Sequence, residues 1–84
     1  MSQMIELTLI GKPGCHLCDD AEAVIDVVLA ELELQIPVDK KNILDDEALF
    51  ARYSEEIPVL LINGKVHNYW HIDPERLRSA LAEL

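Results

Sequence analysis

The chain has 84 residues and a formal net charge of −9 at pH 7, and half of its residues are hydrophobic. This length allows one small domain with a single core, which we expect to span residues 1–84. The hydrophobic content excludes a disordered chain. The acidic balance excludes nucleic acid and anionic membrane surfaces as partners, because both require a basic face.

The N-terminus lacks a basic segment followed by an apolar stretch of signal-peptide length, and no apolar run is long enough to span a bilayer. We therefore expect a cytoplasmic protein. Residues 1–4 are expected to form a frayed leader. In a reducing compartment, two cysteines separated by two residues indicate catalysis or metal binding rather than a structural disulfide.

The first predicted elements are a buried strand and an amphipathic helix. Residues 5–10 form an apolar run, which is typical of a central strand covered on both faces. A Gly/Pro turn follows at residues 11–14. Residues 19–29 then predict a helix, because apolar side chains recur there at intervals of three and four. Its expected buried stripe consists of Ala21, Val24, Ile25, Val28, Leu29 and Leu32.

The middle of the chain predicts a second strand and a short second helix. Residues 34–38 fit the strand, with alternate apolar side chains on one side. Pro37 has no N–H for a ladder hydrogen bond, so we expect this strand at a sheet edge. Residues 40–42 begin a loop, and Asp45 or Asp46 can cap the helix. The helix is expected to end near Tyr53 and to bury Leu49, Phe50 and Tyr53.

The last third predicts a hairpin and a closing helix. Residues 57–62 read as a strand that is apolar on both faces. The Asn-Gly pair at residues 63–64 favours a type I′ turn, so residues 65–69 return as an edge strand. Asp73, followed by proline, is a helix start. The closing helix is expected to bury Leu77, Ala80, Leu81 and Leu84.

A Cys-x-x-Cys motif stands between the first strand and the first helix. Residues three apart at a helix start share one face, so Cys15 and Cys18 can approach within disulfide reach. The first N–H groups of a helix carry partial positive charge and would stabilise a thiolate at Cys15. Protonated His16 would add to this effect, or it is simply a solvated residue, whereas Asp19 and Asp20 would oppose it. We predict Cys15 as the nucleophile and Cys18 as the resolving thiol.

A metal site is the alternative for these cysteines. A closed zinc site needs about four ligands, and His16, His67 and His71 are the nitrogen partners that the chain offers. His16 lies inside the motif and is poorly placed to join both cysteines. The order Cys-His-x-Cys also differs from the Cys-x-x-Cys-His of haem attachment. We therefore favour a redox site without a metal, with His67 and His71 as ordinary surface residues.

Several features together resemble the glutaredoxins, and more closely the short bacterial glutaredoxin-like proteins. They are the element order β-α-β-α-β-β-α, the segment Lys12–Cys18 after the first strand, and Ile57-Pro58 at the third strand. The resemblance covers nearly the whole chain. It implies an α/β, thioredoxin-like fold in which a four-stranded mixed sheet is flanked by three helices. It also implies that the Ile57–Pro58 bond is cis and faces Cys15.

The resemblance implies roles for residues outside the motif. Lys12 stands where a lysine supports the thiolate and a glutathione carboxylate, and Asp73 falls near an acidic position that holds the γ-glutamyl end of glutathione. Ile57 would pair with the substrate through its backbone, and Pro58 corresponds to the cis-proline. Trp70 is expected to pack in the core or at the hairpin end, with the wall of a substrate groove as the alternative.

The chain also departs from the glutaredoxin pattern. His16-Leu17 replaces the common Pro-Tyr between the cysteines, and Glu56 stands where threonine is frequent. Tyr69-Trp70 occupies the place of a Gly-Gly pair. Glycines let a backbone approach a ligand closely, so two large rings would narrow the groove there.

These features predict a thiol–disulfide oxidoreductase that reduces protein disulfides or mixed disulfides with glutathione. It requires no metal or organic cofactor, although glutathione can serve as a co-substrate. Its reductant is either glutathione or a donor of the thioredoxin-reductase type, and we expect a monomer. Two alternatives stay open. One is a redox-sensing or docking module of the same fold without turnover, and the other is a zinc or iron–sulfur carrier that bridges Cys15 between two chains.

Overall fold

The computed structural model describes residues 5–83, so the expected leader at residues 1–4 and the apolar Leu84 lie outside the described residues. Within this range the elements are β1 (Leu7–Gly11), α1 (His16–Glu31), β2 (Val38–Asn42), α2 (Glu47–Tyr53), β3 (Val59–Ile62), β4 (Lys65–Tyr69) and α3 (Pro74–Ala82). A 3₁₀ turn, Ile43–Asp45, precedes α2. The predicted order β-α-β-α-β-β-α is confirmed.

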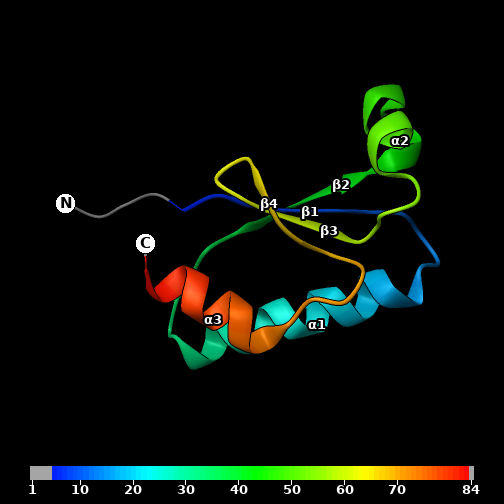
Figure 1. Ribbon diagram of the computed structural model, residues 1–84. Coiled ribbons are helices and arrows are strands. Elements are labelled where there is room, and N and C mark those ends of the chain that lie inside the picture. Colours follow the sequence, from blue (N-terminus) through cyan, green and yellow to red (C-terminus); the bar gives the residue numbers. More distant parts are fainter. Residues whose placement is uncertain (1–4, 84) are drawn as a thin grey trace.

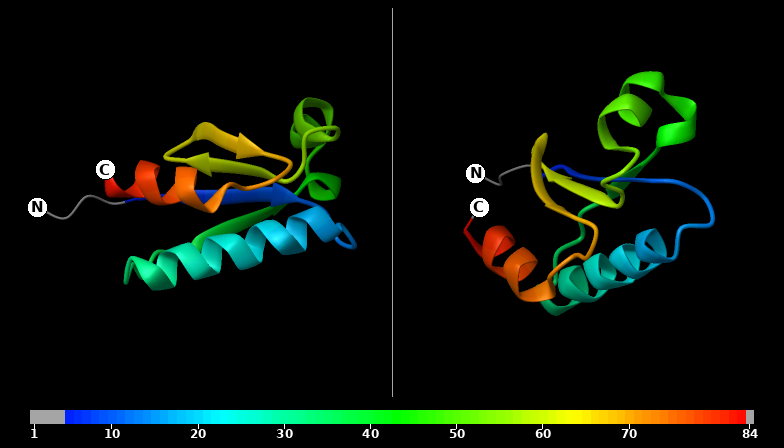
Figure 2. Two further views of the ribbon diagram at one scale, coloured as in Figure 1. Left: turned by 60° about the horizontal axis from the view of Figure 1, so that its bottom comes forward. Right: turned by 45° about the vertical axis from the view of Figure 1, so that its right-hand side comes forward.

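The described strands form one mixed sheet in the order β2-β1-β3-β4. β1 runs parallel to β2 and antiparallel to β3, and β3 pairs antiparallel with β4. The two apolar strands are therefore central, as their sequences predicted. α1 and α3 cover one face of the sheet, and α2 lies on the other side near the end where β1 stops (Figures 1 and 2).

The core consists of two hydrophobic clusters, one on each side of the sheet. The larger lies between the sheet and the α1–α3 layer, and the smaller lies on the α2 side. The larger contains Leu7, Leu9, Ala21, Ile25, Val28, Leu29, Leu60, Ile72, Leu77 and Leu81, and the smaller contains Ile10, Ile43, Tyr53 and Val59. Each fully buried aliphatic side chain stabilises the fold by about 1.5–3 kcal/mol. The predicted stripe of the first helix is confirmed, with Val24 and Leu32 partly buried against the larger cluster.

The predicted helix caps and hairpin turn are confirmed. Asp46 caps α2 and Asp73 caps α3, each through one carboxylate oxygen that accepts two backbone N–H bonds. Asn63 and Gly64 have positive φ angles of 52° and 83°, as the turn between β3 and β4 requires. Among the described helices, none is both long and apolar enough to cross a membrane.

The predicted position of the second strand is wrong. Residues 34–37 lie outside the strands, and β2 starts at Val38, where it pairs with Leu7 at the start of β1. Residues 40–42, expected in a loop, therefore belong to the strand. Alternate burial over residues 32–38 arises because this segment packs on the larger cluster before it enters the ladder. β2 is nevertheless an edge strand, and its charged sequence suits an edge.

Two predicted burial states are also wrong. Phe50 is 49% exposed, because only Tyr53 and part of Leu49 of α2 face the smaller cluster. His67 is half-buried rather than exposed, and its Nε2 atom has no hydrogen-bond partner among the described residues. Burial, followed by the charge of Arg76, lowers the pKa of His67.

Candidate functional site

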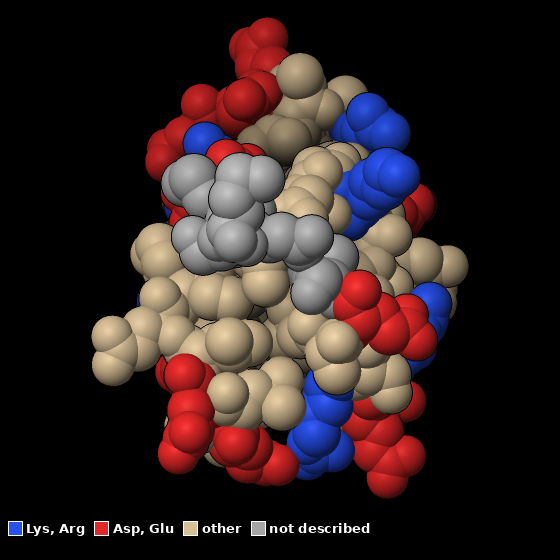
Figure 3. Space-filling view, turned by 90° about the vertical axis from the view of Figure 1, so that its left-hand side faces the viewer, with Lys and Arg blue, Asp and Glu red and all other residues tan. Residues whose placement is uncertain are grey.

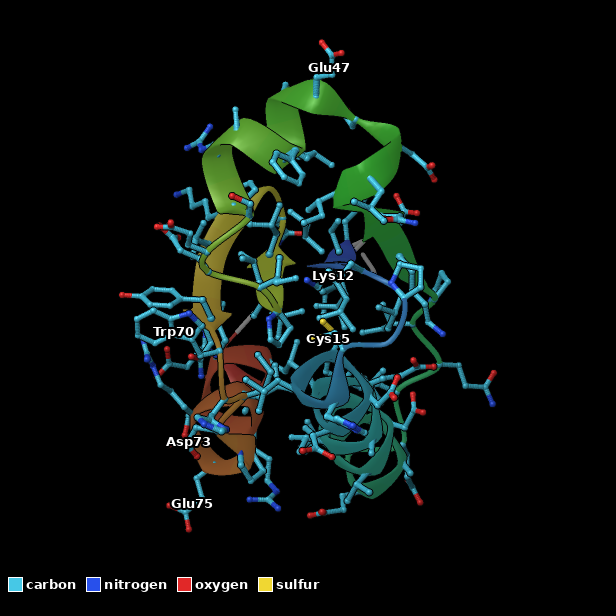
Figure 4. The ribbon with its side chains drawn as sticks, turned by 90° about the vertical axis from the view of Figure 1, so that its right-hand side faces the viewer. Lys12, Cys15, Glu47, Trp70, Asp73 and Glu75 are labelled. Atoms are coloured by element: carbon cyan, nitrogen blue, oxygen red, sulfur yellow. The ribbon has the colours of Figure 1, made fainter. Side chains whose placement is uncertain are left out.

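The Cys-x-x-Cys motif lies at the end of the sheet where β1 stops and α1 begins. Gly14 has a positive φ of 76° and turns the chain out of the strand. Cys15 follows as the N-cap residue of α1, with an extended backbone at φ −93° and ψ 113°. Figure 4 looks onto this end of the molecule and shows Cys15 near its centre, with Lys12 close by. The motif therefore lies at an accessible position at the end of β1.

Cys15 places a half-buried sulfur at the start of α1. Its Sγ accepts a hydrogen bond of 3.2 Å from the backbone N–H of Cys18, and its carbonyl accepts the first helical bond from Asp19 at 3.1 Å. The hydrogen bond confirms that the two cysteines are close. Because free N–H groups at a helix start carry partial positive charge, they stabilise an anion on the capping atom.

Cys18 lies in the first turn of α1 and is 8% exposed. Burial raises its pKa to about 11, its hydrogen bond with Cys15 acts in the same direction, and a hydrogen bond with the backbone of Lys12 opposes them. Both cysteines are free thiols. At neutral pH Cys18 is therefore held as a protonated thiol behind the more accessible Cys15.

Gly11 is a site residue that sequence reasoning missed. A Cβ atom at this position would lie 2.7 Å from the Sγ of Cys18 and 3.3 Å from its Cβ. The sulfur of Cys18 therefore fills the space that any other residue at position 11 would need. The available signal was the glycine itself, because glycine at the end of an apolar strand often marks the close approach of another group.

Pro58 lies beside this end of β1. Val59 pairs with Ile10, so Pro58 stands next to Gly11 as β3 begins. The Ile57–Pro58 bond is cis, which confirms the isomer that the resemblance implied. Ile57 is half-buried and packs on the smaller core cluster.

Trp70 lies on the far side of Pro58 from the cysteines. Its backbone N–H donates to the Pro58 carbonyl at 2.8 Å, and its Nε1–H donates to the carbonyl of Glu55 at 3.0 Å. The residue is thus fixed at the hairpin end, one of its two expected positions, but its side chain is 49% exposed and not part of the core. Asp73 lies on the same side (Figure 4), and its Oδ1 accepts from the N–H groups of Glu75 and Arg76 at 3.0 and 3.4 Å.

Lys12 lies on the other side of the motif, towards β2. It is exposed and lines a cavity of about 250 Å³ together with Gly11, Cys18, Lys40 and Lys41. Lys40 forms a salt bridge with Glu22, and Lys41 forms one with Asp39 at 3.4 Å. His16 is exposed as the first residue of α1. The structure therefore gathers the two cysteines, Lys12, His16 and Pro58 at one end, with Trp70 and Asp73 at its β4 side.

Residues 6–82 match the family model described as "Glutaredoxin-like domain (DUF836)". The chain belongs to this glutaredoxin-like family. The match includes both cysteines and every element of the sheet.

Individual relatives are similar over nearly the full chain. An uncharacterized protein of Mycobacterium tuberculosis is 29% identical over 80 residues, covering 92% of this chain and 82% of the relative. The X-ray structure of target protein XcR50 from X. campestris is 33% identical with a TM-score of 0.71, covering 93% of this chain and 97% of that one. A thioredoxin-2 of a malaria parasite, at 17% identity and a TM-score of 0.66, covers 100% of this chain and 86% of that one. This last likeness concerns the fold alone.

The donor atoms at the site bear on metal binding. Among residues 5–83, no group of three or more His, Cys, Asp or Glu side chains converges on a common metal position. Two thiolates without further ligands cannot complete the four-coordinate shell of a structural zinc ion. The chemistry that this arrangement supports directly is exchange between thiols and disulfides.

Proposed function

We propose that this glutaredoxin-like protein is a thiol–disulfide oxidoreductase in which Cys15 attacks and Cys18 resolves. The observation that carries the proposal is the difference between the two cysteines. Cys15 is half-exposed at the start of α1, and its sulfur accepts a hydrogen bond from the backbone N–H of Cys18, which is buried one turn further on. A disulfide between two such residues closes within a single turn of helix.

The reaction balances as two successive exchanges. The Cys15 thiolate attacks one sulfur of a substrate disulfide, forms a mixed disulfide and releases the other sulfur as a thiolate. Cys18 then loses its proton to solvent and attacks Cys15, which releases the reduced substrate and leaves a Cys15–Cys18 disulfide. An external dithiol, or two molecules of a monothiol such as glutathione, returns the pair to its reduced state. No metal or organic cofactor takes part.

The surrounding residues bind and orient the substrate in this proposal. Lys12 lies three residues before Cys15 and His16 directly after it, and both side chains are exposed, so they can contact a substrate bound at Cys15. Ile57 and Pro58 provide backbone beside the motif for an extended substrate segment. Asp73 borders the site on the β4 side. We propose that the protein works as a cytoplasmic monomer with one domain, on protein disulfides or mixed disulfides of glutathione.

Trapping of the mixed disulfide tests this assignment. The Cys18→Ser variant is incubated with a disulfide substrate and analysed by mass spectrometry after acid quenching, with Cys15→Ser as the matched control. We expect a stable adduct on Cys15 in the first variant and none in the second. An adduct on Cys18, or equal adducts in both variants, would contradict the assigned roles. Oxidation without any turnover of the wild-type protein would instead identify a redox-sensing module.

A further inference from the structure

A pair of exposed aromatic side chains lies beside the cysteine site without a role in the exchange reaction. Tyr69 is 45% exposed and Trp70 is 49% exposed, and their rings meet edge to face with centroids 5.0 Å apart. The backbone bond from Trp70 to the Pro58 carbonyl ties this pair to the strand that borders the cysteine motif. Exposed large aromatic side chains of this kind are the residues that most often anchor protein partners.

Trp70 is held in a backbone conformation that side chains rarely adopt. Its φ is 64°, in the left-handed region where a Cβ atom meets steric crowding. The backbone bond to Pro58 and the indole bond to the Glu55 carbonyl fix this conformation at both ends of the residue. The indole is therefore presented to solvent in one orientation, without being packed in the core. Strain held in place beside a reactive group suggests a role in function.

Acidic residues predominate in the segments that carry the aromatic pair and the carbonyl partner of Trp70. Residues 54–56 and 69–76 contain four carboxylates, one arginine, Arg76, and one histidine, His71. These carboxylates belong to Glu55, Glu56, Asp73 and Glu75, and none of them forms a salt bridge with another residue of 5–83. We name Tyr69, Trp70 and these four residues the aromatic–acidic face. Figure 4 shows Trp70, Asp73 and Glu75 together on one side of Cys15, whereas the opposite end of the molecule presents acidic and basic side chains around an uncharged region (Figure 3).

We propose that the aromatic–acidic face binds the polypeptide partner of Cys15 and selects a segment with an arginine or lysine close to its half-cystine. A cation is attracted to the face of a tryptophan ring, and carboxylates that form no salt bridge add to that attraction. Glutathione carries two carboxylates and one ammonium group, so these charges attract it less than they attract a cationic polypeptide segment. This inference rests on the proposed function, because it names the substrate class of that site.

Exchange kinetics with matched peptides test the selectivity. Three peptides of equal length carry one cysteine, linked to mercaptoethanol as a mixed disulfide, and differ only in having arginine, glutamine or glutamate next to it. Hydroxyethyl disulfide, which is small and neutral, normalises each measurement for the reactivity of Cys15. We expect kcat/KM to fall from arginine to glutamine to glutamate by about tenfold in total at low salt, and to converge at high salt. Equal rates for the three peptides would overturn the proposal.

Matched variants locate the selectivity on the molecule. Trp70→Ala and the double variant Glu55→Gln/Glu56→Gln should each lower the normalised preference for the arginine peptide at least about threefold. Phe50→Ala, which removes an equally exposed ring from α2, and Glu47→Gln should leave the preference unchanged. An equal loss in the control variants would overturn the assignment to this face.

Fluorescence separates this inference from the proposed function. Trp70 is the only tryptophan of the chain, so its emission reports directly on the face. The arginine peptide with serine in place of cysteine should quench or shift this emission at lower concentration than the glutamate peptide does. Selective binding without any disulfide exchange would uphold the face and contradict the oxidoreductase. Exchange without selective binding would uphold the oxidoreductase and contradict the assignment of the face.

Discussion

The surroundings of the two cysteines differ although both residues lie at the start of one helix. Cys15 caps α1 with a half-exposed sulfur that accepts a backbone N–H bond. Cys18 is 8% exposed, is packed against Gly11, and has its pKa raised to about 11 by burial. A step of three residues at the start of α1 therefore separates an accessible cysteine from a buried one that lies beside Gly11, at the end of β1.

This difference shows that reactivity is set by position in the fold rather than by residue type. A thiol attacks only as its thiolate. Cys18, which is buried and has a raised pKa, therefore reacts more slowly than the accessible Cys15 at the helix start. Under the proposed function, this order prevents both cysteines from capturing substrate at once. The following predictions test the difference, from the largest expected effect to the smallest.

Alkylation rates should separate the two thiols most strongly. Iodoacetamide at neutral pH should modify Cys18 far more slowly than Cys15, because Cys18 is buried and its pKa, about two units above the ordinary 9.0, lowers its own thiolate fraction about a hundredfold. Rates are measured on the wild-type protein, where digestion and mass spectrometry assign each label to Cys15 or Cys18. Similar rates at the two residues would show that the surroundings do not control reactivity.

Gly11→Ala should slow the reaction of Cys18 and leave the reaction rate of Cys15 unchanged. The added Cβ would lie 2.7 Å from the Cys18 sulfur, which must move. Resolution of the mixed disulfide should slow by about tenfold to a hundredfold, since a misplacement of about 1 Å can cost that much. Stopped-flow measurement separates this step from the first attack, which should keep its rate.

Thermal unfolding of Gly11→Ala provides the control for a general loss of structure. An unchanged rate of resolution in a folded variant would show that the Cys18 sulfur does not depend on the space beside Gly11.

Cys15→Ala should lower the pKa of Cys18. Burial is the largest cause of the raised value and stays, but the hydrogen bond with Cys15 and its charge, which also raise it, are lost. Ultraviolet thiolate absorbance against pH measures the change. An unchanged pKa of Cys18 would contradict a contribution from Cys15.

The pH dependence of stability is a second measurement of the same effect. The Cys18 thiol has a pKa near 9.0 in the unfolded chain and about 11 in the folded one, so the free energy of unfolding falls as the pH rises between these values. This fall should be shallower in Cys15→Ala.

Asp46→Ala should change neither thiol. Asp46 caps α2 through bonds of 2.9 and 3.2 Å from the N–H groups of Ala48 and Leu49. Its loss should lower the free energy of unfolding by about 1 kcal/mol. Urea unfolding measures the stability, and the ratio of the two alkylation rates should stay at its wild-type value. A changed ratio would mean that global stability, rather than local surroundings, sets the difference.

The sequence allowed prediction of those features that depend on neighbouring residues. The caps at Asp46 and Asp73, the turn at residues 63–64 and the buried stripe of α1 follow from local geometry and periodicity, and the structure confirms them. The positions of Cys15 and Cys18 at the start of a helix follow from the same local pattern.

The features that sequence reasoning missed depend on contacts between distant segments. The sequence pattern predicts the second strand four residues before the start of β2, because the register of β2 is set by β1, through the pairing of Val38 with Leu7. The space beside Gly11, the burial of His67 and the fixed, exposed ring of Trp70 likewise arise only when separate elements meet. Periodicity within one element carries no information about such contacts.

A redox titration tests the central claim most directly. The wild-type protein is equilibrated in glutathione buffers of stepped ratio, quenched with acid and analysed by mass spectrometry. The proposed mechanism predicts a reversible disulfide between Cys15 and Cys18, with any glutathione adduct confined to Cys15. Failure to form an intramolecular disulfide in even the most oxidising buffer would contradict the dithiol mechanism.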